Sequence, residues 1–340
     1  MDEVNPGDME IYGMKKAMVT GVTGQDGFYM AKLLSGEGYE VLGLGHRSDR
    51  PEDIDSTIHY RYLDIVQDNL LYDIVDQFKP DEIYNFAAQS SSINSWQDTR
   101  DTIRRNTMAV AAILESIRDN TPHTKMFQAS SAEVFGQTPA DVPQKESTLR
   151  QPFTPYATAK IATDSLINEY RLHYGIFAVS GILYNHESPR RKSEFLSTKI
   201  ARTVAEINRH QTECLYVGNL DSRRDWGYAP DYMYAAWRTL QLDKADDYIF
   251  ATGIQHTVRE YIEVAFQSAD IQIRWKGVGI DEVGIDDATG RIVVAVDKQY
   301  YRDYDRCDSI GNPEKLYNAI NWRPQTSFED MVMLITKAFI

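Results

Sequence analysis

The chain has 340 residues and a net charge of −14, with 42% hydrophobic and 25% charged residues. This composition is ordinary for a globular protein of one large or two modest domains, and the acidic balance argues against a nucleic-acid binder. No apolar run approaches the length of a membrane helix, and residues 1–13 lack the features of a signal peptide, so we interpret them as a flexible tail.

Apolar strands alternate with amphipathic helices along much of the chain. We expect strands at 17–20, 39–44, 82–86, 125–128 and 177–182, and helices around 29–34, 70–77, 106–118 and 157–174. A helix over 231–242 and a strand over 248–253 are expected to return to the same sheet. This order predicts an α/β fold with a Rossmann-type, doubly wound parallel sheet that binds ligands at the carboxyl ends of its strands.

The first expected strand runs into a glycine turn with the spacing G-x-x-G-x-x-G, at Gly21, Gly24 and Gly27. Between a strand and a helix, such glycines let a pyrophosphate come close to the helix N-terminus, which predicts dinucleotide binding. An ordinary strand–helix turn is the alternative. The predicted cofactor site also includes the other polar residues of this turn, Thr23, Gln25 and Asp26.

Residues at the ends of the following strands are expected to select and hold the cofactor. NAD binders usually carry a carboxylate after the second strand, whereas this chain has Arg47, which can pair with a ribose 2′-phosphate and predicts NADP. A surface arginine is the alternative. Asp64 is expected at the adenine amino group or, equally, as a loop cap. Ala87 and Gln89 follow the next strand and are expected to line the pyrophosphate.

Four side chains in the middle of the chain form a candidate acid/base set. Ser131 and Glu133 follow the strand at 125–128, while Tyr156 and Lys160 lie one turn apart at the start of the next helix. The lysine charge favours the phenolate, which suits proton removal from a sugar hydroxyl while a hydride leaves the same carbon. Glu133 offers a second acid/base that alcohol oxidation does not need, with a capping or ion-pair carboxylate as the alternative.

These motifs together resemble those of the extended short-chain dehydrogenase/reductases. More closely, the chain is similar to the GDP-mannose 4,6-dehydratase family over about residues 15–335, through further matching stretches at 181–191, 218–227, 251–253 and 258–260. One departure is Ser131, which stands where the family usually has threonine and keeps the hydroxyl without the methyl group.

The resemblance implies a redox-neutral dehydration of GDP-mannose with a tightly held NADP, in which Tyr156 and Lys160 also contact the cofactor. Tyr156 would take the proton of the sugar O4 while hydride passes from C4 to the cofactor. Glu133 would then remove the C5 proton, water would leave from C6, and hydride would return to C6. The implied product is a GDP-4-keto-6-deoxy sugar.

The resemblance also implies a nucleotide-sugar site. The residues that would hold the diphosphate and ribose are Asn185, Lys199, Arg224 and Arg302. Asp305 would approach the ribose or sugar hydroxyls, and Ser90 lies in a segment expected near the nicotinamide and the sugar. The adjacent Arg190 and Arg191 are either part of this site or a solvated surface pair.

Some segments depart from the family pattern. The run 301–306 lacks the usual proline, threonine and glutamate, and the loop after Arg47 is short and acidic where relatives bridge subunits. Dehydration of another GDP-sugar, such as a GDP-heptose, is therefore an alternative. So are an NADP-dependent reductase or epimerase of a GDP-4-keto sugar and a catalytically silent NADP sensor. We expect a homodimer or homotetramer with no nucleic-acid or membrane partner.

The domain organisation follows from these assignments. Residues 14–183 with about 218–254 are expected to form the NADP-binding Rossmann domain. Residues 184–217 with about 255–340 look less regular and are expected to form a smaller α/β lobe that binds the nucleotide-sugar. The acidic run 281–287 is interpreted as a solvated loop.

The cysteines and histidines of the sequence bear on the cellular location and on metal binding. Cys214 and Cys307 are far apart in the sequence and form no disulfide framework, which predicts a reducing, cytoplasmic location. The histidines show no HxxxH or HExxH spacing, so no metal site is expected.

Overall fold

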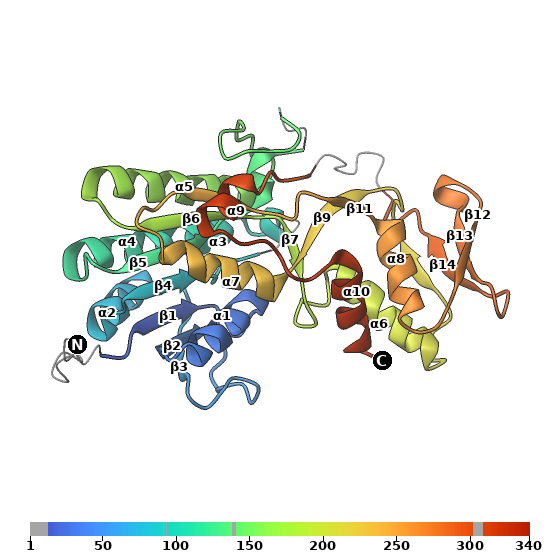
Figure 1. The fold of residues 1–340 in the computed structure, drawn as a ribbon, viewed down its shortest axis with the longest axis horizontal. Coiled ribbons are helices and arrows are strands. Elements are labelled where there is room, and N and C mark those ends of the chain that lie inside the picture. Colours follow the sequence, from blue (N-terminus) through green and yellow to red (C-terminus); the bar gives the residue numbers. More distant parts are fainter. Residues whose placement is uncertain (1–12, 91, 93, 138–140, 302–308) are drawn as a thin grey trace, which may run out of the picture.

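The computed structural model describes residues 13–90, 92, 94–137, 141–301 and 309–340. A seven-stranded parallel sheet lies at its centre, with the strand order β10-β6-β5-β4-β1-β2-β3 (Figure 1). Its strands are β1 (Lys16–Thr20), β2 (Glu40–Gly45), β3 (His59–Tyr62), β4 (Glu82–Asn85), β5 (Lys125–Ala129), β6 (Ala178–Leu183) and β10 (Asp247–Phe250). The expected Rossmann-type sheet is therefore confirmed, and each predicted strand agrees with an observed one to within about three residues.

Helices cover both faces of this sheet. The helices α1 (Gln25–Gly36) and α7 (Ala229–Leu240) pack on one face, and α2 (Asp68–Phe78), α4 (Ala109–Asn120) and α5 (Pro155–Tyr174) pack on the other. Alternate residues of one strand serve both cores, because Val19 packs beneath α1 and α7 whereas Met18 packs beneath α2 and α4. This two-sided burial explains why the central strands read as continuous apolar runs.

Short irregular elements interrupt the simple alternation. A short helix α3 (Thr99–Ile103) and a π-helical turn η2 (Arg104–Met108) precede α4, so the helix predicted from residue 106 begins regular α geometry at Ala109. Two 3₁₀ turns, η1 (Asn94–Trp96) and η3 (Ala132–Phe135), follow β4 and β5. They lie at the carboxyl edge of the sheet, where ligands bind in folds of this class.

A second lobe lies beside the large sheet. Its helices α6 (Leu196–Asn208), α8 (Val258–Gln267) and α10 (Phe328–Lys337) surround a separate apolar core that contains Trp226 and Phe266. The remaining elements are β7 (Asn185–Glu187), β8 (Leu215–Val217), β9 (Arg223–Tyr228), β11 (Gln255–Thr257), β12 (Ile273–Lys276), η4 (Gly279–Asp281), β13 (Val283–Asp286), β14 (Ile292–Val296) and α9 (Glu314–Ile320).

One expectation about this lobe is wrong. We expected the acidic run 281–287 to be a solvated loop, but most of it forms β13, which pairs with β12 and β14. The error comes from a short amphipathic strand whose polar side chains dominate the local composition. The segments that looked less regular in the sequence also contain α6, α8 and α10, and each of these helices buries an apolar face in the second core.

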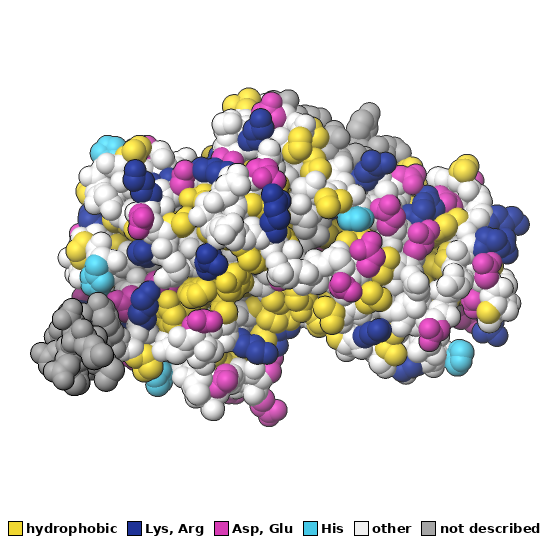
Figure 2. All heavy atoms as spheres, in the orientation of Figure 1, with side chains coloured by type: hydrophobic (Ala, Val, Ile, Leu, Met, Phe, Trp, Pro, Cys, Tyr) yellow, Lys and Arg dark blue, Asp and Glu magenta, His cyan; other side chains and the backbone are white. Residues whose placement is uncertain are grey.

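The chain crosses between the two cores more than once. Strand β9 pairs with β7 and β11, whereas α9 returns to the large sheet and buries Leu316 and Tyr317 beside α7. The exact boundaries of the two domains remain a prediction. Figure 2 shows acidic and basic side chains interspersed over one face of the molecule, with hydrophobic side chains gathered along the middle. On that face, the net charge is not concentrated in a single acidic patch.

Candidate active site

The glycine turn brings backbone segments into unusually close contact. Gly21 has a φ of +70°, and a Cβ at this position would lie 2.9 Å from the amide nitrogen of Ala87. A Cβ at Gly27 would lie 2.3 Å from the carbonyl oxygen of Gly21. Gly24, which has no side chain, stands at the N-cap of α1. The turn therefore presents bare backbone and a helix N-terminus to the carboxyl edge of the sheet, as a pyrophosphate requires.

Two polar side chains of the turn are held by the segment that enters the second lobe. The Gln25 amide donates to the carbonyl oxygen of His186 at 3.0 Å and accepts from the Ser188 hydroxyl at 2.7 Å. Both oxygens of Asp26 lie 3.0 Å from Nε2 of His186. These side chains, predicted to bind the cofactor, thus make internal contacts, and their backbone amides open helix α1.

The protonation state of His186 follows from its partners. Its Nδ1 lies 2.7 Å from the carbonyl oxygen of Tyr184, and its Nε2 faces the Asp26 carboxylate. Because these oxygens only accept hydrogen bonds, both ring nitrogens must donate, and the ring is an imidazolium. Burial lowers the pKa of His186, but the charge and the hydrogen bond of Asp26, together with the hydrogen bond to Tyr184, raise it overall. Burial likewise raises the pKa of Asp26, but His186 and Gln25 bring it down to about 2.

The other residues predicted to bind the cofactor lie along the same carboxyl edge of the sheet and differ in exposure and in the internal contacts that they make. Arg47 is exposed in the loop after β2. Asp64 forms an ion pair with Arg105 at 2.7 Å and accepts from the amide of Val66 at 3.3 Å, which agrees with the alternative of a loop cap. Thr23 lies 3.3 Å from a ring nitrogen of His46, next to Arg47.

The strand end after β4 approaches the glycine turn. The Ala87 amide donates to Thr20 Oγ1 at 3.0 Å, which fixes this segment against the end of β1. Gln89 exchanges two hydrogen bonds with Asn106 of the π-helical turn, through its backbone amide at 2.8 Å and its carbonyl at 3.0 Å. Ser90 is exposed beside it.

Tyr156 stands at the start of α5, where the local sequence favours a helix N-terminus. Thr154 is the N-cap, and its hydroxyl accepts from the amide of Ala157 at 3.1 Å, while proline at position 155 suits the first turn. The Tyr156 side chain is buried. Burial raises the pKa of its phenol to about 12, the hydrogen bond with Ser131 opposes this rise, and the charge of Glu133 adds to it.

Lys160 lies one helical turn further along α5. Its ammonium is 5.6 Å from the centre of the Tyr156 ring and donates to the carbonyl oxygen of Ala129 at 2.6 Å. Burial lowers the pKa of Lys160 to about 8, against the opposing charges of Asp164 and Asp26. From the spacing we expected the lysine charge to favour the Tyr156 phenolate, and that remains a prediction; burial is the largest influence on the pKa of both groups.

The end of β5 brings the hydroxyl and the carboxylate to the same place. Ser131 is the N-cap of η3, and its hydroxyl accepts from the amide of Glu133 at 3.3 Å. The adjacent Ser130 hydroxyl donates to Asp164 at 2.8 Å, which fixes this turn against α5, the helix that carries Tyr156 and Lys160. The structure therefore brings Ser131, Glu133 and Tyr156 together beside Lys160, as the sequence predicted.

The residues predicted to bind the nucleotide-sugar come from several elements of the second lobe. Asn185 begins β7, Lys199 lies on α6 and Arg224 lies on β9, with Asn185 paired in register with Trp226 of β9. The Lys199 ammonium lies 3.7 Å from the centre of the Tyr300 ring. Burial lowers the pKa of Lys199, against the charge of Asp297. Arg302, Asp305 and Cys307 lie outside the described residues, as do residues 1–12 of the predicted tail.

The double arginine is not a solvated pair. The guanidinium of Arg190 packs 3.7 Å from the Phe28 ring of α1 and pairs with Asp53. Arg191 packs 3.8 Å from the Phe195 ring and is 17% exposed. Both side chains therefore fasten the segment after β7, and Arg190 fastens it to the large sheet.

Some residues engaged at the site were not singled out from the sequence. His186 contacts Asp26 of the glycine turn, and Asp164 of α5 accepts a hydrogen bond from Ser130 in the turn after β5. The matching stretch at 181–191 contained His186 but gave no sign of its partner. Among the described residues, no group of three metal-ligating side chains is close enough to hold an ion, and no helix is long and apolar enough to cross a membrane.

Comparison with known proteins agrees with this geometry. The family model for GDP-mannose 4,6 dehydratase matches residues 18–335. A GDP-mannose 4,6-dehydratase of Yersinia enterocolitica is 37% identical, covering 94% of this chain and 92% of its own length. One of Drosophila melanogaster is 39% identical, covering 96% and 86%. A Thermus thermophilus UDP-glucose 4-epimerase solved with NAD has a TM-score of 0.77 at 23% identity, covering 95% of this chain and 98% of that one.

The fold and the edge that carries Tyr156 and Lys160 define the class of extended short-chain dehydrogenase/reductases. Solved structures of sugar-nucleotide epimerases and dehydratases share this overall fold. Within it, the chain belongs to the GDP-mannose 4,6-dehydratase family, which the matched region and the curated relatives establish.

Proposed function

We propose that the protein converts GDP-mannose to GDP-4-keto-6-deoxymannose with loss of one water. The observation that carries this proposal is a second acid/base, Glu133, beside the buried Tyr156 in a chain of this family. A dehydration needs one group to deprotonate a hydroxyl and another to deprotonate a carbon. The Tyr156 phenol and the Glu133 carboxylate supply these two functions.

Each side chain has a distinct task in this proposal. Tyr156 accepts the proton of the sugar O4, and Lys160 stabilises the resulting phenolate with its ammonium. Ser131 binds O4 through its hydroxyl, which acts on the Tyr156 phenol and lowers the pKa of that group. Once C4 is a ketone, the proton at C5 is acidic, and Glu133 removes it and passes it to the C6 hydroxyl, which leaves as water. Tyr156 then gives the proton that it took from O4 to C5 as hydride returns to C6.

We infer that the cofactor is NADP, held by the glycine turn and by Arg47. The bare backbone of Gly21, Gly24 and Gly27 fits a pyrophosphate, because a side chain at Gly21 or Gly27 would collide with neighbouring backbone. The exposed guanidinium of Arg47 suits a 2′-phosphate, and the similar epimerase solved with NAD supports a nicotinamide dinucleotide. A cofactor held there would supply the redox chemistry, because its nicotinamide would take up the hydride from C4 and give it back at C6.

The nucleotide end of the substrate is assigned to the second lobe. Arg224 and Lys199 supply positive charge for the diphosphate, and Asn185 supplies an amide for hydrogen bonding. Arg302 and Asp305 are proposed to complete this site. We further propose that the protein is a cytoplasmic homo-oligomer. We also propose that residues 14–183 with about 218–254 form the cofactor domain and that residues 184–217 with about 255–340 form the nucleotide-sugar lobe.

The comparisons favour dehydration of GDP-mannose over the alternatives of a different GDP-sugar, a reductase or epimerase of a GDP-4-keto sugar, or a silent sensor. The test is to incubate the purified protein with NADP and GDP-mannose that carries deuterium at C4, with no added reductant. Loss of one water with deuterium found at C6 supports the proposal. Unchanged GDP-mannose, or product formed only with added NADPH, contradicts it.

A further inference from the structure

A buried row of polar residues crosses the large sheet just below the candidate site. The strand register aligns Thr20 of β1, Asn85 of β4, Gln128 of β5 and Ser180 of β6, and extends the row to Asp247 of β10. The first four are at most 2% exposed. Two residues earlier in each of these four strands, the side chain on the same face of the sheet is apolar and packs beneath α2, α4 and α5. Polar groups buried in this way are stable only when hydrogen bonded.

The row carries hydrogen bonds from the glycine turn to the catalytic lysine. Thr20 donates to Asn85 at 2.5 Å, and Asn85 donates to Gln128 at 2.7 Å. The Gln128 amide donates to the carbonyl oxygen of Ala129 at 2.9 Å, the same oxygen that accepts from Lys160 at 2.6 Å. The ammonium of Lys160 is thereby fixed in position, but by a neutral partner.

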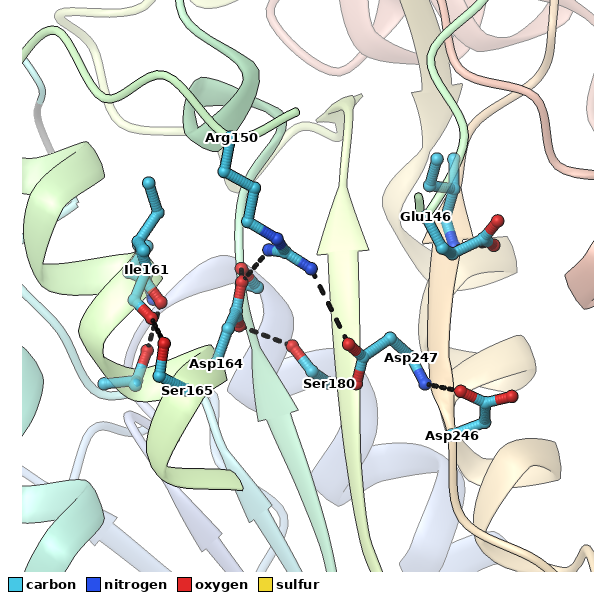
Figure 3. A network of polar contacts seen from close by, with 12 residues as sticks. Glu146, Arg150, Ile161, Asp164, Ser165, Ser180, Asp246 and Asp247 are labelled. Carbon is cyan, nitrogen blue, oxygen red and sulfur yellow. Dashed lines mark hydrogen bonds and ion pairs between the residues drawn. The ribbon is translucent and has the colours of Figure 1, made fainter. Parts of the chain in front are cut away.

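Asp164 supplies the negative charge on this side of the lysine. It lies one helical turn beyond Lys160 on α5, and its side chain is 5% exposed. It accepts a hydrogen bond from Ser180 at 2.6 Å (Figure 3). It accepts a second one from Ser130 at 2.8 Å. Arg150 forms an ion pair with it from the loop before α5.

The charged groups around this pair can be named element by element. Arg150 also lies 3.6 Å from Asp247 of β10 (Figure 3). Asp247 in turn binds Arg171 of α5 at 2.9 Å. Asp26 of α1 is the other carboxylate that acts on Lys160. Asp247 does not act on Lys160 directly, although it belongs to the same network.

We propose that Asp164 is a positioning residue of the reaction, which holds Lys160 in its ammonium form and fixes the Ser130–Ser131 turn against the catalytic helix. This inference rests on the proposed function, because it assigns Lys160 the task of stabilising the Tyr156 phenolate. A buried ammonium next to a neutral carbonyl needs a compensating carboxylate to remain charged.

The proposal has a consequence for the coupled pair of Tyr156 and Lys160. After one proton is lost, either the phenolate faces the ammonium or the phenol faces a neutral amine, and only the first form is active. Asp164 is one turn from Lys160 but two turns from Tyr156, so its charge favours the active form. Without that charge, the lysine loses its proton at lower pH and a smaller fraction of the pair is active.

The test compares Asp164→Asn with Asp247→Asn, which removes the same kind of charge from the same network. The full chain is labelled with ¹⁵N-lysine, and the Nζ signal of Lys160, assigned with Lys160→Met, is followed over pH without substrate. In Asp164→Asn we expect this signal to titrate at lower pH than in the wild type, and the plateau of kcat to fall about tenfold. Asp247→Asn should leave both unchanged.

Each outcome decides the proposal. An unchanged Lys160 titration in Asp164→Asn, or an equal change in Asp247→Asn, overturns it. If Asp164→Asn does not fold, Ser180→Ala takes its place, because it removes a hydrogen bond that holds the Asp164 carboxylate ionised. Ser180→Ala should shift the Lys160 titration in the same direction by less, and no shift overturns the proposal. The titration uses no substrate, so it is read separately from a failure of the proposed dehydratase activity.

Discussion

The imidazolium of His186 links the glycine turn to the second lobe, and its removal should destabilise the protein in a pH-dependent way. The substitution is His186→Gln, which leaves Asp26 with only the neutral Gln25 as a side-chain partner. Burial raises the pKa of Asp26, but His186, with smaller contributions from Gln25 and Arg191, lowers it overall from 3.8 to about 2. A difference of that size corresponds to about 2 kcal/mol at neutral pH, and breaking a buried pair costs about 3 to 5 kcal/mol.

The pH window follows from the signs of the two shifts. The lowered pKa of Asp26 contributes stability above 3.8, which is lost as pH falls through about 2. The raised pKa of His186 contributes stability below 6.5, which is lost as pH rises through the folded value. The pair therefore contributes fully between these unfolded values, and we expect His186→Gln to lose about 2 to 4 kcal/mol there.

Urea unfolding at about pH 5.5 and pH 9.5 measures this difference. Tryptophan fluorescence and far-UV circular dichroism should be followed together, because a chain with two cores need not unfold in one step. His173→Gln is the matched control, since His173 is an exposed histidine paired with Glu169 at the surface. A loss in His186→Gln that is the same at both pH values, or no larger than that of His173→Gln, would refute the reasoning.

Three further outcomes test the site. Glu133→Gln should bind GDP-mannose and NADP normally but lower turnover at least a hundredfold, and near-normal turnover would remove Glu133 from its role. Arg47→Ala should weaken NADP about tenfold and leave NAD unchanged, as measured by calorimetry, and equal losses for both would contradict the 2′-phosphate assignment. Gly27→Ala should abolish cofactor binding, because its Cβ would lie 2.3 Å from the Gly21 oxygen, and retained affinity in the equilibrium titration would exclude a tight turn.

The sequence predicted the large sheet well because most of its strands are rich in apolar residues and have helices between them. The second lobe was harder, since β7, β8 and β11 are only three residues each. Such strands give too little alternation to be recognised, and they form because β9 and β14 provide partners that are distant in sequence.

The acid/base residues could be predicted because each follows a strand or opens a helix close by in the chain. The pair of Asp26 and His186 could not, because its members are 160 residues apart and meet only through the fold. Asp164 was equally hidden, since an aspartate at this spacing on a helix is usually solvated. Its burial depends on Ser180 of β6 and on Arg150 from a loop.

Asp26 acts both on the buried ion pair with His186 and on the pair of Tyr156 and Lys160. It binds His186 on the lobe side, and its charge also acts on Lys160 and Tyr156. A negative charge there favours the ammonium of Lys160 but opposes the phenolate of Tyr156, whereas Asp164 lies closer to the lysine and is not among the principal charges acting on the tyrosine. The imidazolium of His186 partly neutralises Asp26, which weakens its opposition to the phenolate. The charges of two carboxylates therefore act on the pair of Tyr156 and Lys160. That of Asp26 is balanced by His186, and that of Asp164 is balanced by Arg150.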